Sequence, residues 1–261
     1  MTEDYMPKEL VEKIRRAIDE MPQFSIVADK AMVGLREQAL SGESLKTLGM
    51  HDARFAQQIL QMTKYAAFGF GGPGMVSQGS VALEDKDVLR GVMLAFSLQD
   101  FISGELKAYG QISGELWEHS INCGLSAWMI ATKTNFNDLE QAFVAGMMHD
   151  IGKIVLDKFL CEERLMFVDT ITEDALTPAE AEKALLGIDH AEAGALLAEK
   201  WHFDDAVVEA IRWHHEPEKA SDGSDLTVFV HLADCMCMSL GHALQEDGLV
   251  SLLAGNIPSL D

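Results

Sequence analysis

Histidines and carboxylates suited to metal binding gather in the second half of this 261-residue sequence. Glu115 and His119 are four residues apart and therefore share a face if they lie on a helix. The pair His149-Asp150 follows an apolar run, and Asp234 lies within another apolar segment. Imidazole and carboxylate groups are ligands of zinc, manganese, iron and nickel, and a mixed set favours an open site that carries water. These residue types predict a transition-metal centre in this part of the chain.

Three further histidines and one lysine extend the set. His190 opens a predicted helix, and the pair His214-His215 closes another. Lys153 lies one helical turn after His149. A centre of this kind can lower the pKa of bound water and deliver hydroxide to an electrophile, and two ions could clamp both oxygens of a displacement at phosphorus. Each pattern arises often by chance, so the inference depends on their combination and order.

The elements that must position these residues are predicted to be helices throughout. Apolar residues recur with helical spacing in 7–20, 25–39, 52–65 and 85–106, and again in 112–132, 138–159, 178–186, 190–202, 204–214 and 226–244. Five glycines between residues 69 and 79 predict a loop that joins two helical groups. No segment shows the alternation of a strand. We therefore expect an N-terminal helical subdomain over residues 1–108 and a helical core with the metal ligands over 109–261.

The composition limits the range of partners. The formal net charge of −22 repels phosphodiester backbones, so nucleic acid is not an expected partner. No stretch reaches the roughly 18 apolar residues of a membrane span, and the acidic start of the chain does not resemble a secretory signal. The four cysteines form no disulfide framework, which favours a reducing, cytoplasmic location. Cys235 and Cys237 would point in different directions on a helix and are expected to be small buried hydrophobes.

The order of the ligand types resembles a known signature. The HD superfamily of metal-dependent phosphohydrolases carries a His, then a His-Asp pair, then a distant Asp, and here these are His119, His149-Asp150 and Asp234. The run AFVAGMMHDIGKIVL carries the strongest likeness, because small and apolar residues lead into the His-Asp pair as they do in that superfamily.

Within this superfamily the sequence also resembles the HD-GYP branch of cyclic-di-nucleotide phosphodiesterases. Glu115, His190 and the pair His214-His215 stand at the places of its additional ligands, and Lys153 matches the lysine near its metals. The segment HHEPEKASDGSD, however, lacks the Gly-Tyr-Pro of that branch, which argues against hydrolysis of cyclic di-GMP.

Length and order are closer to the HDOD family, the HD-related output domains of bacterial signalling. The segment DHAEAGALLAEKWHFDDAVVEAIRWHHEPE resembles the most recognisable part of that family, while MPQFSIVADKAMVGL and ILQMTKYAAFGF resemble its leading helices. The resemblance spans about residues 21–245. It implies an all-α fold in which an N-terminal helical subdomain precedes a multi-helix HD-superfamily domain.

The resemblance also implies roles for the individual residues. One to three divalent transition-metal ions are expected, of iron, manganese, zinc or nickel, with iron favoured. Asp150 would bridge two ions, Glu115 would complete a site or orient an imidazole, and Lys153 would face a substrate phosphate; Asp150 and Lys153 are the candidate catalytic residues. The ligands fall into two groups: His119, His149 and Asp234 for one ion, and His190, His214 and His215 for the other.

Three functions remain open at this point. The first is an HDOD-type bacterial signalling protein with a binuclear His/Asp centre and a protein partner. The second is a phosphohydrolase that acts on a nucleotide or other small phosphoester through metal-bound hydroxide. The third is a di-iron oxygenase, which is supported only by the types of ligand.

Overall fold

The computed structural model describes residues 6–22, 95, 98–221 and 224–239, and these residues form helices joined by short turns. Among them there is no β-strand, and only one isolated bridge pairs Leu106 with Gln111. The all-α prediction is therefore confirmed. The predicted helices at 25–39 and 52–65, the glycine-rich loop, most of the 85–106 segment and the end of the 226–244 segment lie outside the described residues.

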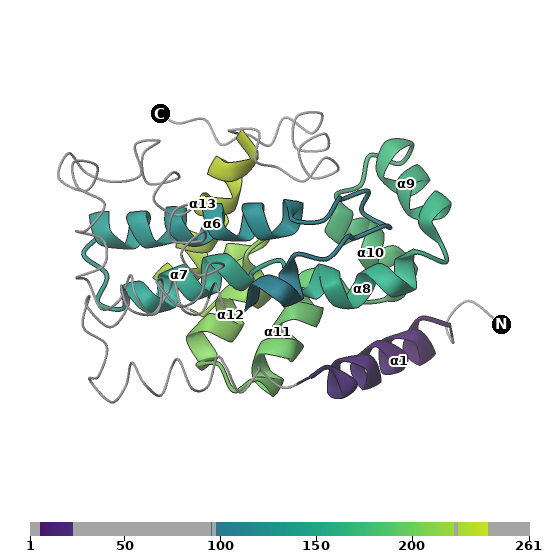
Figure 1. The fold of residues 1–261 in the computed structure, drawn as a ribbon, viewed down its shortest axis with the longest axis horizontal. Helices are drawn as coiled ribbons and strands as arrows, with labels where there is room; N and C mark the ends of the chain where they lie inside the picture. The colour runs from purple at the N-terminus through teal and green to yellow at the C-terminus, as the bar shows by residue number, and fades with distance from the viewer. Residues whose placement is uncertain (1–5, 23–94, 96–97, 222–223, 240–261) are drawn as a thin grey trace, which may run out of the picture.

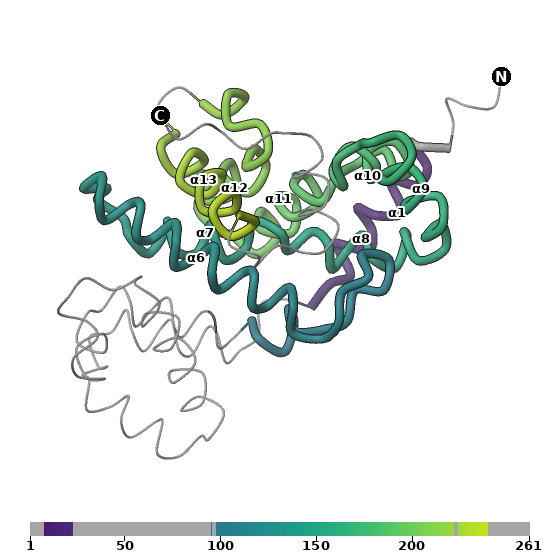
Figure 2. The backbone as a smooth tube through the Cα atoms, turned by 90° about the horizontal axis from the view of Figure 1, so that it is seen from above, coloured from purple at the N-terminus to yellow at the C-terminus, as the bar shows by residue number. Residues whose placement is uncertain are grey.

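The helices that carry or flank the predicted ligands pack against one another, and Figure 1 shows their arrangement. Helices α6 and α7 pack against each other, and α13 contacts both. Helix α11 packs between α8 and α12, while α1, α9 and α10 lie toward the opposite end of the molecule from α12 and α13 (Figure 2). The helices are α1 (Met6–Glu20), α6 (Glu115–Lys133), α7 (Leu139–Met148), α8 (Gly152–Leu160), α9 (Arg164–Thr172), α10 (Pro178–Leu186), α11 (His190–Lys200), α12 (Asp205–Trp213), a 3-10 turn (Pro217–Lys219) and α13 (Asp225–Ser239).

Helix α1 shows how the apolar stripe of a helix directs its packing. Ile14 and Ile18 are buried in the core, and Leu10 and Val11 pack against it, as their spacing predicts. The ammonium of Lys200 on α11 donates hydrogen bonds to backbone carbonyls at the end of α1. The N-terminal helix is thereby fixed to the same core as the predicted ligands.

Capping residues set the ends of the helices around the site. Thr177 and Glu180 form a capping box at the start of α10, and Gly187 ends that helix with a left-handed backbone at φ 77°. Asp189 then accepts a hydrogen bond from the Glu192 N–H and caps α11. These local signals determine where the chain turns between α10 and α11, and hence where His190 stands.

The structure corrects two predicted helices and adds a third. The segment 138–159 is predicted as one helix but forms two, because the chain turns through His149, Asp150 and Ile151 with hydrogen bonds of the i to i+3 type. Helix α6 starts at Glu115 rather than at 112, since Gly114 adopts a left-handed backbone there. Helix α9 was not predicted; it has only nine residues, and two of its apolar side chains, Leu165 and Met166, are exposed rather than part of a buried stripe.

Two glycines allow the helices around the site to approach closely. A Cβ atom on Gly146 of α7 would lie 2.7 Å from the carbonyl oxygen of Cys123 on α6. A Cβ atom on Gly152, at the start of α8, would overlap the carbonyl oxygen of His190 at the start of α11. Side chains at either position would force the helices apart, so both contacts depend on glycine.

Candidate metal centre

A first group of ligand atoms comes from α6, the α7–α8 turn and α13. The Nε2 atoms of His119 and His149 are 3.2 Å apart. Asp234 Oδ1 lies 3.2 Å from His119 Nε2 and 3.6 Å from His149 Nε2. All three side chains are buried or nearly so. Two imidazoles and one carboxylate thus converge on one point.

A second group comes from the start of α11 and the end of α12. The Nε2 atoms of His190 and His215 are 2.9 Å apart, and the rings of His214 and His215 lie with their centroids 4.0 Å apart. One nitrogen from each of the three rings lies within 4.8 Å of the others. His190 and His214 are fully buried, whereas His215 is exposed, so this group reaches the protein surface.

Asp150 lies between the two groups. Its Oδ2 is 3.5 Å from the Nε2 atoms of both His119 and His149. Its other oxygen, Oδ1, is 3.3 Å from His190 Nε2. One carboxylate oxygen therefore faces each group, which is the arrangement that a bridging ligand requires. The structure thus brings together the seven residues His119, His149, Asp150, His190, His214, His215 and Asp234.

Hydrogen bonds on the far side of two rings fix which nitrogen faces the cluster. His149 Nδ1 lies 2.7 Å from the carbonyl oxygen of Gly146, and His214 Nδ1 lies 2.7 Å from that of Ile211. A carbonyl can only accept, so each Nδ1 carries a proton, and in the neutral form of each ring Nε2 presents its lone pair to the cluster. Neutral imidazoles held in this way are prepared to bind a metal ion.

His214 provides a direct test of whether the cluster fits a metal. Its Nε2 is buried and has no hydrogen-bond partner among the described residues. Burial and the neighbouring histidines His215, His149 and His190 lower the pKa of His214 well below its ordinary value, so the ring stays neutral. A buried lone pair without a partner is costly in a protein. A cation in the cluster would satisfy it, and the donor set fits a transition metal.

Charges within the cluster favour the ionised carboxylates. Burial opposes the charge of Asp150, but Lys153 and the three nearest histidines hold its pKa well below the usual value. Burial would lower the pKa of His119, yet the hydrogen bond and charge of Asp234 raise it to about 9. Lys153 itself is almost fully buried, with its ammonium 3.1 Å from Asp150 Oδ2.

Glu182 on α10 is a residue that the sequence reasoning missed. Its carboxylate is fully buried and accepts hydrogen bonds from His190 Nδ1 at 2.7 Å, from the His190 backbone N–H at 2.6 Å and from the Tyr109 hydroxyl at 2.7 Å. This carboxylate orients the His190 ring, and its charge, working against burial, raises the pKa of His190 to about 9. A carboxylate behind a metal-binding histidine strengthens it as a ligand.

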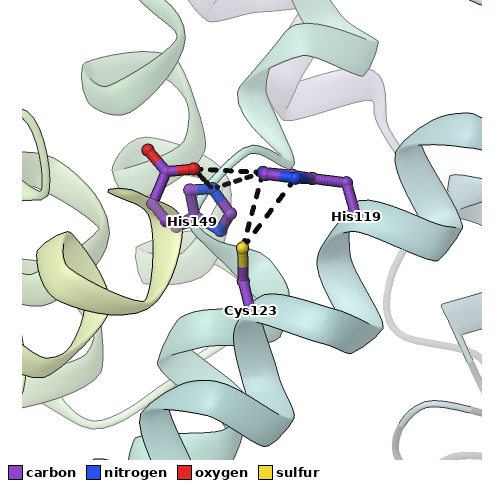
Figure 3. A group of neighbouring side chains, drawn as sticks. His119, Cys123 and His149 are labelled. Carbon is purple, nitrogen blue, oxygen red and sulfur yellow. Dashed lines mark hydrogen bonds and ion pairs between the residues drawn. The ribbon is translucent and has the colours of Figure 1, made fainter. Parts of the chain in front are cut away.

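Cys123 is the second residue that was missed. It is fully buried on α6, and its Sγ lies 3.5 Å from His119 Nε2. Figure 3 shows Cys123, His119 and His149 pointing toward one another. Burial, Cys237 and the nearby carboxylates raise the pKa of the Cys123 thiol well above its ordinary value. The spacing of four residues from His119 is the signal that could have identified it.

Other predicted residues take other positions. The Glu115 carboxylate accepts a hydrogen bond from the Ile112 backbone N–H at 2.9 Å, at the start of α6, and is not one of the grouped ligand atoms. Cys235 and Cys237 diverge as expected: Cys235 Sγ faces His231, and Cys237 Sγ faces Ser126. Cys237 is buried as predicted, whereas Cys235 is only partly buried. Among the described helices, none combines the length and apolar character required to cross a bilayer.

Comparison with known proteins gives a consistent picture. The sequence matches the HDOD domain family over residues 21–217. A solved HDOD domain protein of Geobacter sulfurreducens superposes with a TM-score of 0.67 at 21% identity, covering 95% of this chain and 94% of that one. A Marinobacter aquaeolei protein, provisionally named a signal transduction protein, superposes with a TM-score of 0.61 at 18% identity, covering 95% of this chain and 59% of the other.

Among curated relatives, Ribonuclease Y of Geobacter sulfurreducens is 30% identical over 133 residues, which are 51% of this chain. The chain spans about a fifth of the length of the curated relatives it matches. The two solved structures, at under 25% identity, show that the fold is shared.

Proposed function

This chain belongs to the HDOD family, and we propose that it is a bacterial signalling protein whose helical core holds a binuclear transition-metal centre. The position of Asp150 carries the proposal. One of its oxygens faces the pair His119 and His149, while the other faces His190. Such a carboxylate can give one oxygen to each of two ions, and six further candidate ligands surround it.

The chain's own residues prepare the centre. Gly146 and Ile211 accept the Nδ1 protons of His149 and His214, which leaves the Nε2 lone pairs directed inward. Glu182 holds the Nδ1 proton of His190 with a charged acceptor, so that Nε2 of this ring also faces the cluster. When bound, the ions would supply Lewis acidity and an activated water molecule.

The two groups differ in exposure, which bears on the role in signalling. The first group is buried, whereas the second reaches the surface through the exposed His215. A small phosphorylated ligand could therefore approach the second ion, and that ion would offset the negative charge of the protein locally. A signalling role needs such an accessible site, or a surface whose stability depends on metal, to pass information to a protein partner.

Metal analysis tests the proposal. Protein purified without chelator should contain about two transition-metal ions per chain. Asp150→Asn should lose at least one of them, because an amide cannot bridge two cations as a carboxylate does. Asp174→Asn, at an exposed aspartate in the turn after α9, is the matched control and should retain both. Protein that binds no transition metal when it is added in excess would refute the proposal.

A second candidate function is hydrolysis of a phosphoester. It is favoured by the buried Lys153, whose ammonium lies 3.1 Å from Asp150 Oδ2, and by the relatives named Ribonuclease Y. The charge of −22 disfavours long nucleic acids as substrates, so a small phosphoester is the better choice.

Turnover separates the two candidates. If the chain is a hydrolase, metal-loaded protein should cleave a generic phosphodiester, and Lys153→Met should abolish cleavage while metal remains bound. Lys158→Met on the exposed side of α8 is the control and should leave cleavage unchanged. Absence of turnover in fully metal-loaded protein across phosphomonoesters and phosphodiesters would leave the signalling function alone.

A further inference from the structure

A cysteine lies beside the first ligand group, and we propose that Cys123 is itself a ligand of the metal ion bound there. This inference rests on the proposed metal centre and specifies its chemistry. With Cys123, the first ligand group offers nitrogen, oxygen and sulfur atoms to its metal ion. The other group, formed by His190, His214, His215 and one oxygen of Asp150, contains nitrogen and oxygen only.

The helix places the sulfur on the correct face. Cys123 follows His119 by four residues on α6, so the two side chains lie one turn apart on the same side. The sulfur is 3.5 Å from His119 Nε2 and 3.9 Å from Nδ1 of the same ring (Figure 3). It shares a sphere with His149 and Asp234, since the four ligand atoms all lie within 4.8 Å of one another.

The distances match the edges of a coordination tetrahedron. Around a zinc ion with nitrogen and oxygen ligands at about 2.05 Å and sulfur at about 2.3 Å, nitrogen or oxygen atoms lie about 3.3 Å apart, and sulfur lies about 3.6 Å from them. The observed separations are 3.2 Å between the two Nε2 atoms, 3.2 and 3.6 Å from these to Asp234 Oδ1, and 3.5 Å from the sulfur to His119 Nε2.

Asp150 is compatible with this geometry. Its Oδ2, which also contacts Lys153, is 3.5 Å from both Nε2 atoms and can join as a fifth, bridging ligand. Zinc sites accept a fifth ligand of this kind. The sulfur and the bridge therefore do not exclude each other.

Backbone packing holds the sulfur and His149 in register. Gly146 on α7 packs directly on the carbonyl of Cys123, at a distance that leaves no room for a Cβ atom. The carbonyl of the same Gly146 accepts the Nδ1 proton of His149. One glycine thus sets the backbone position of Cys123 relative to α7 and orients the ring of His149.

The common role of a buried free cysteine is that of a small hydrophobe. The neighbouring Cys237 is not among the grouped ligand atoms, and its sulfur lies 3.8 Å from the Ser126 hydroxyl. Cys123 instead contacts a ring nitrogen of a predicted ligand. On metal binding its thiol proton passes to solvent and the thiolate donates to the ion.

A thiolate changes which metal the site selects. Sulfur ligands favour zinc and iron over manganese and magnesium, whereas the second group of imidazoles and one carboxylate lacks that bias. The two ions are therefore held in unlike sites, and a soft metal should enter the Cys123 site first.

X-ray absorption at the zinc edge tests the proposal on the full chain loaded with zinc, with metal content measured on the same samples. We expect a sulfur scatterer at about 2.3 Å from zinc. Cys123→Ser should remove it while zinc remains bound. Cys161→Ser, at an exposed cysteine, and Cys237→Ser should both leave the sulfur signal unchanged.

The possible outcomes distinguish a failure of the Cys123 ligand from a failure of the proposed metal centre. Zinc-loaded wild-type protein without sulfur scattering would overturn the role of Cys123 and leave the metal centre standing. Sulfur scattering that persists in Cys123→Ser would overturn it as well. Protein that binds no zinc would overturn both. The wild-type spectrum is decisive by itself, so the test stands even if Cys123→Ser folds poorly.

Discussion

Replacement of Glu182 by glutamine tests the centre through a residue that lies behind it. The carboxylate accepts three hydrogen bonds, two from His190 and one from Tyr109, and is fully buried. Glutamine has the same shape but only one acceptor oxygen and no charge. One of the three donors would then face an NH2 group, and the His190 ring would lose its charged partner.

The magnitude follows from the role of such carboxylates. Loss of a hydrogen-bonded carboxylate behind a metal-binding histidine costs about 10- to 100-fold in metal affinity, which corresponds to about 1.4–2.7 kcal/mol. Only the second site should be affected, because Glu182 contacts His190 and none of the residues His119, His149 or Asp234. Glu182→Gln should therefore bind one ion with unchanged affinity and the other more weakly.

The assay is a metal titration of metal-free protein by calorimetry, with metal content determined after dialysis at a low free-metal concentration. Wild-type protein and Glu173→Gln, at an exposed carboxylate at the end of α9, should retain two ions. Glu182→Gln should retain one. Two ions bound with wild-type affinity in Glu182→Gln would refute the role assigned to this carboxylate, and equal weakening of both would show a general structural defect instead.

Three further predictions follow from the packing and the charges. Gly152→Ala should lower the free energy of unfolding in urea by about 3 kcal/mol, because the new Cβ would overlap the His190 carbonyl. The control Gly104→Ala, whose Cβ would have nothing within 4 Å, should change that free energy by less than about 0.5 kcal/mol. Equal effects of the two substitutions would contradict the close contact at Gly152. In metal-free protein the pKa of His119 and of His190 is raised from 6.5 to about 9. The stability that these two protonated rings give the folded state is therefore complete below pH 6.5 and is lost as the pH rises through 9. A thermal unfolding midpoint that stays constant over this interval would contradict the prediction. Removal of metal by a chelator should lower the free energy of unfolding, measured by denaturant titration. The expected loss is about 2.7 kcal/mol per site, relative to protein with free metal at 100 times Kd. An unchanged free energy of unfolding would contradict metal binding by the folded state.

Part of the site could be predicted because the types and the order of its residues resemble a known signature. His119, His149-Asp150 and Asp234 stand in an order with strong precedent, and the structure places them together. Apolar spacing was likewise sufficient for α1 and α10, whose boundaries agree with the prediction within a residue.

The remainder depends on tertiary contacts. The apolar run from α7 into α8 continues across His149-Asp150, so periodicity did not reveal the turn that separates the two helices. Glu182 matters because α10 turns back on α11, which no spacing in the sequence specifies. Glu115 and Cys123 both lie four residues from His119, and the approach of α7 at Gly146 decides that Cys123 faces the cluster.

The central claim is that two metal ions share Asp150. Anomalous X-ray scattering from crystals of the metal-loaded protein, recorded at the absorption edge of the bound metal, tests it most directly. We predict two peaks about 3.5–4 Å apart on either side of the Asp150 carboxylate. One should lie among His119, His149 and Asp234, and the other beside His190. Metal-loaded crystals with no peak in this cluster, or with a single peak remote from Asp150, would contradict the claim.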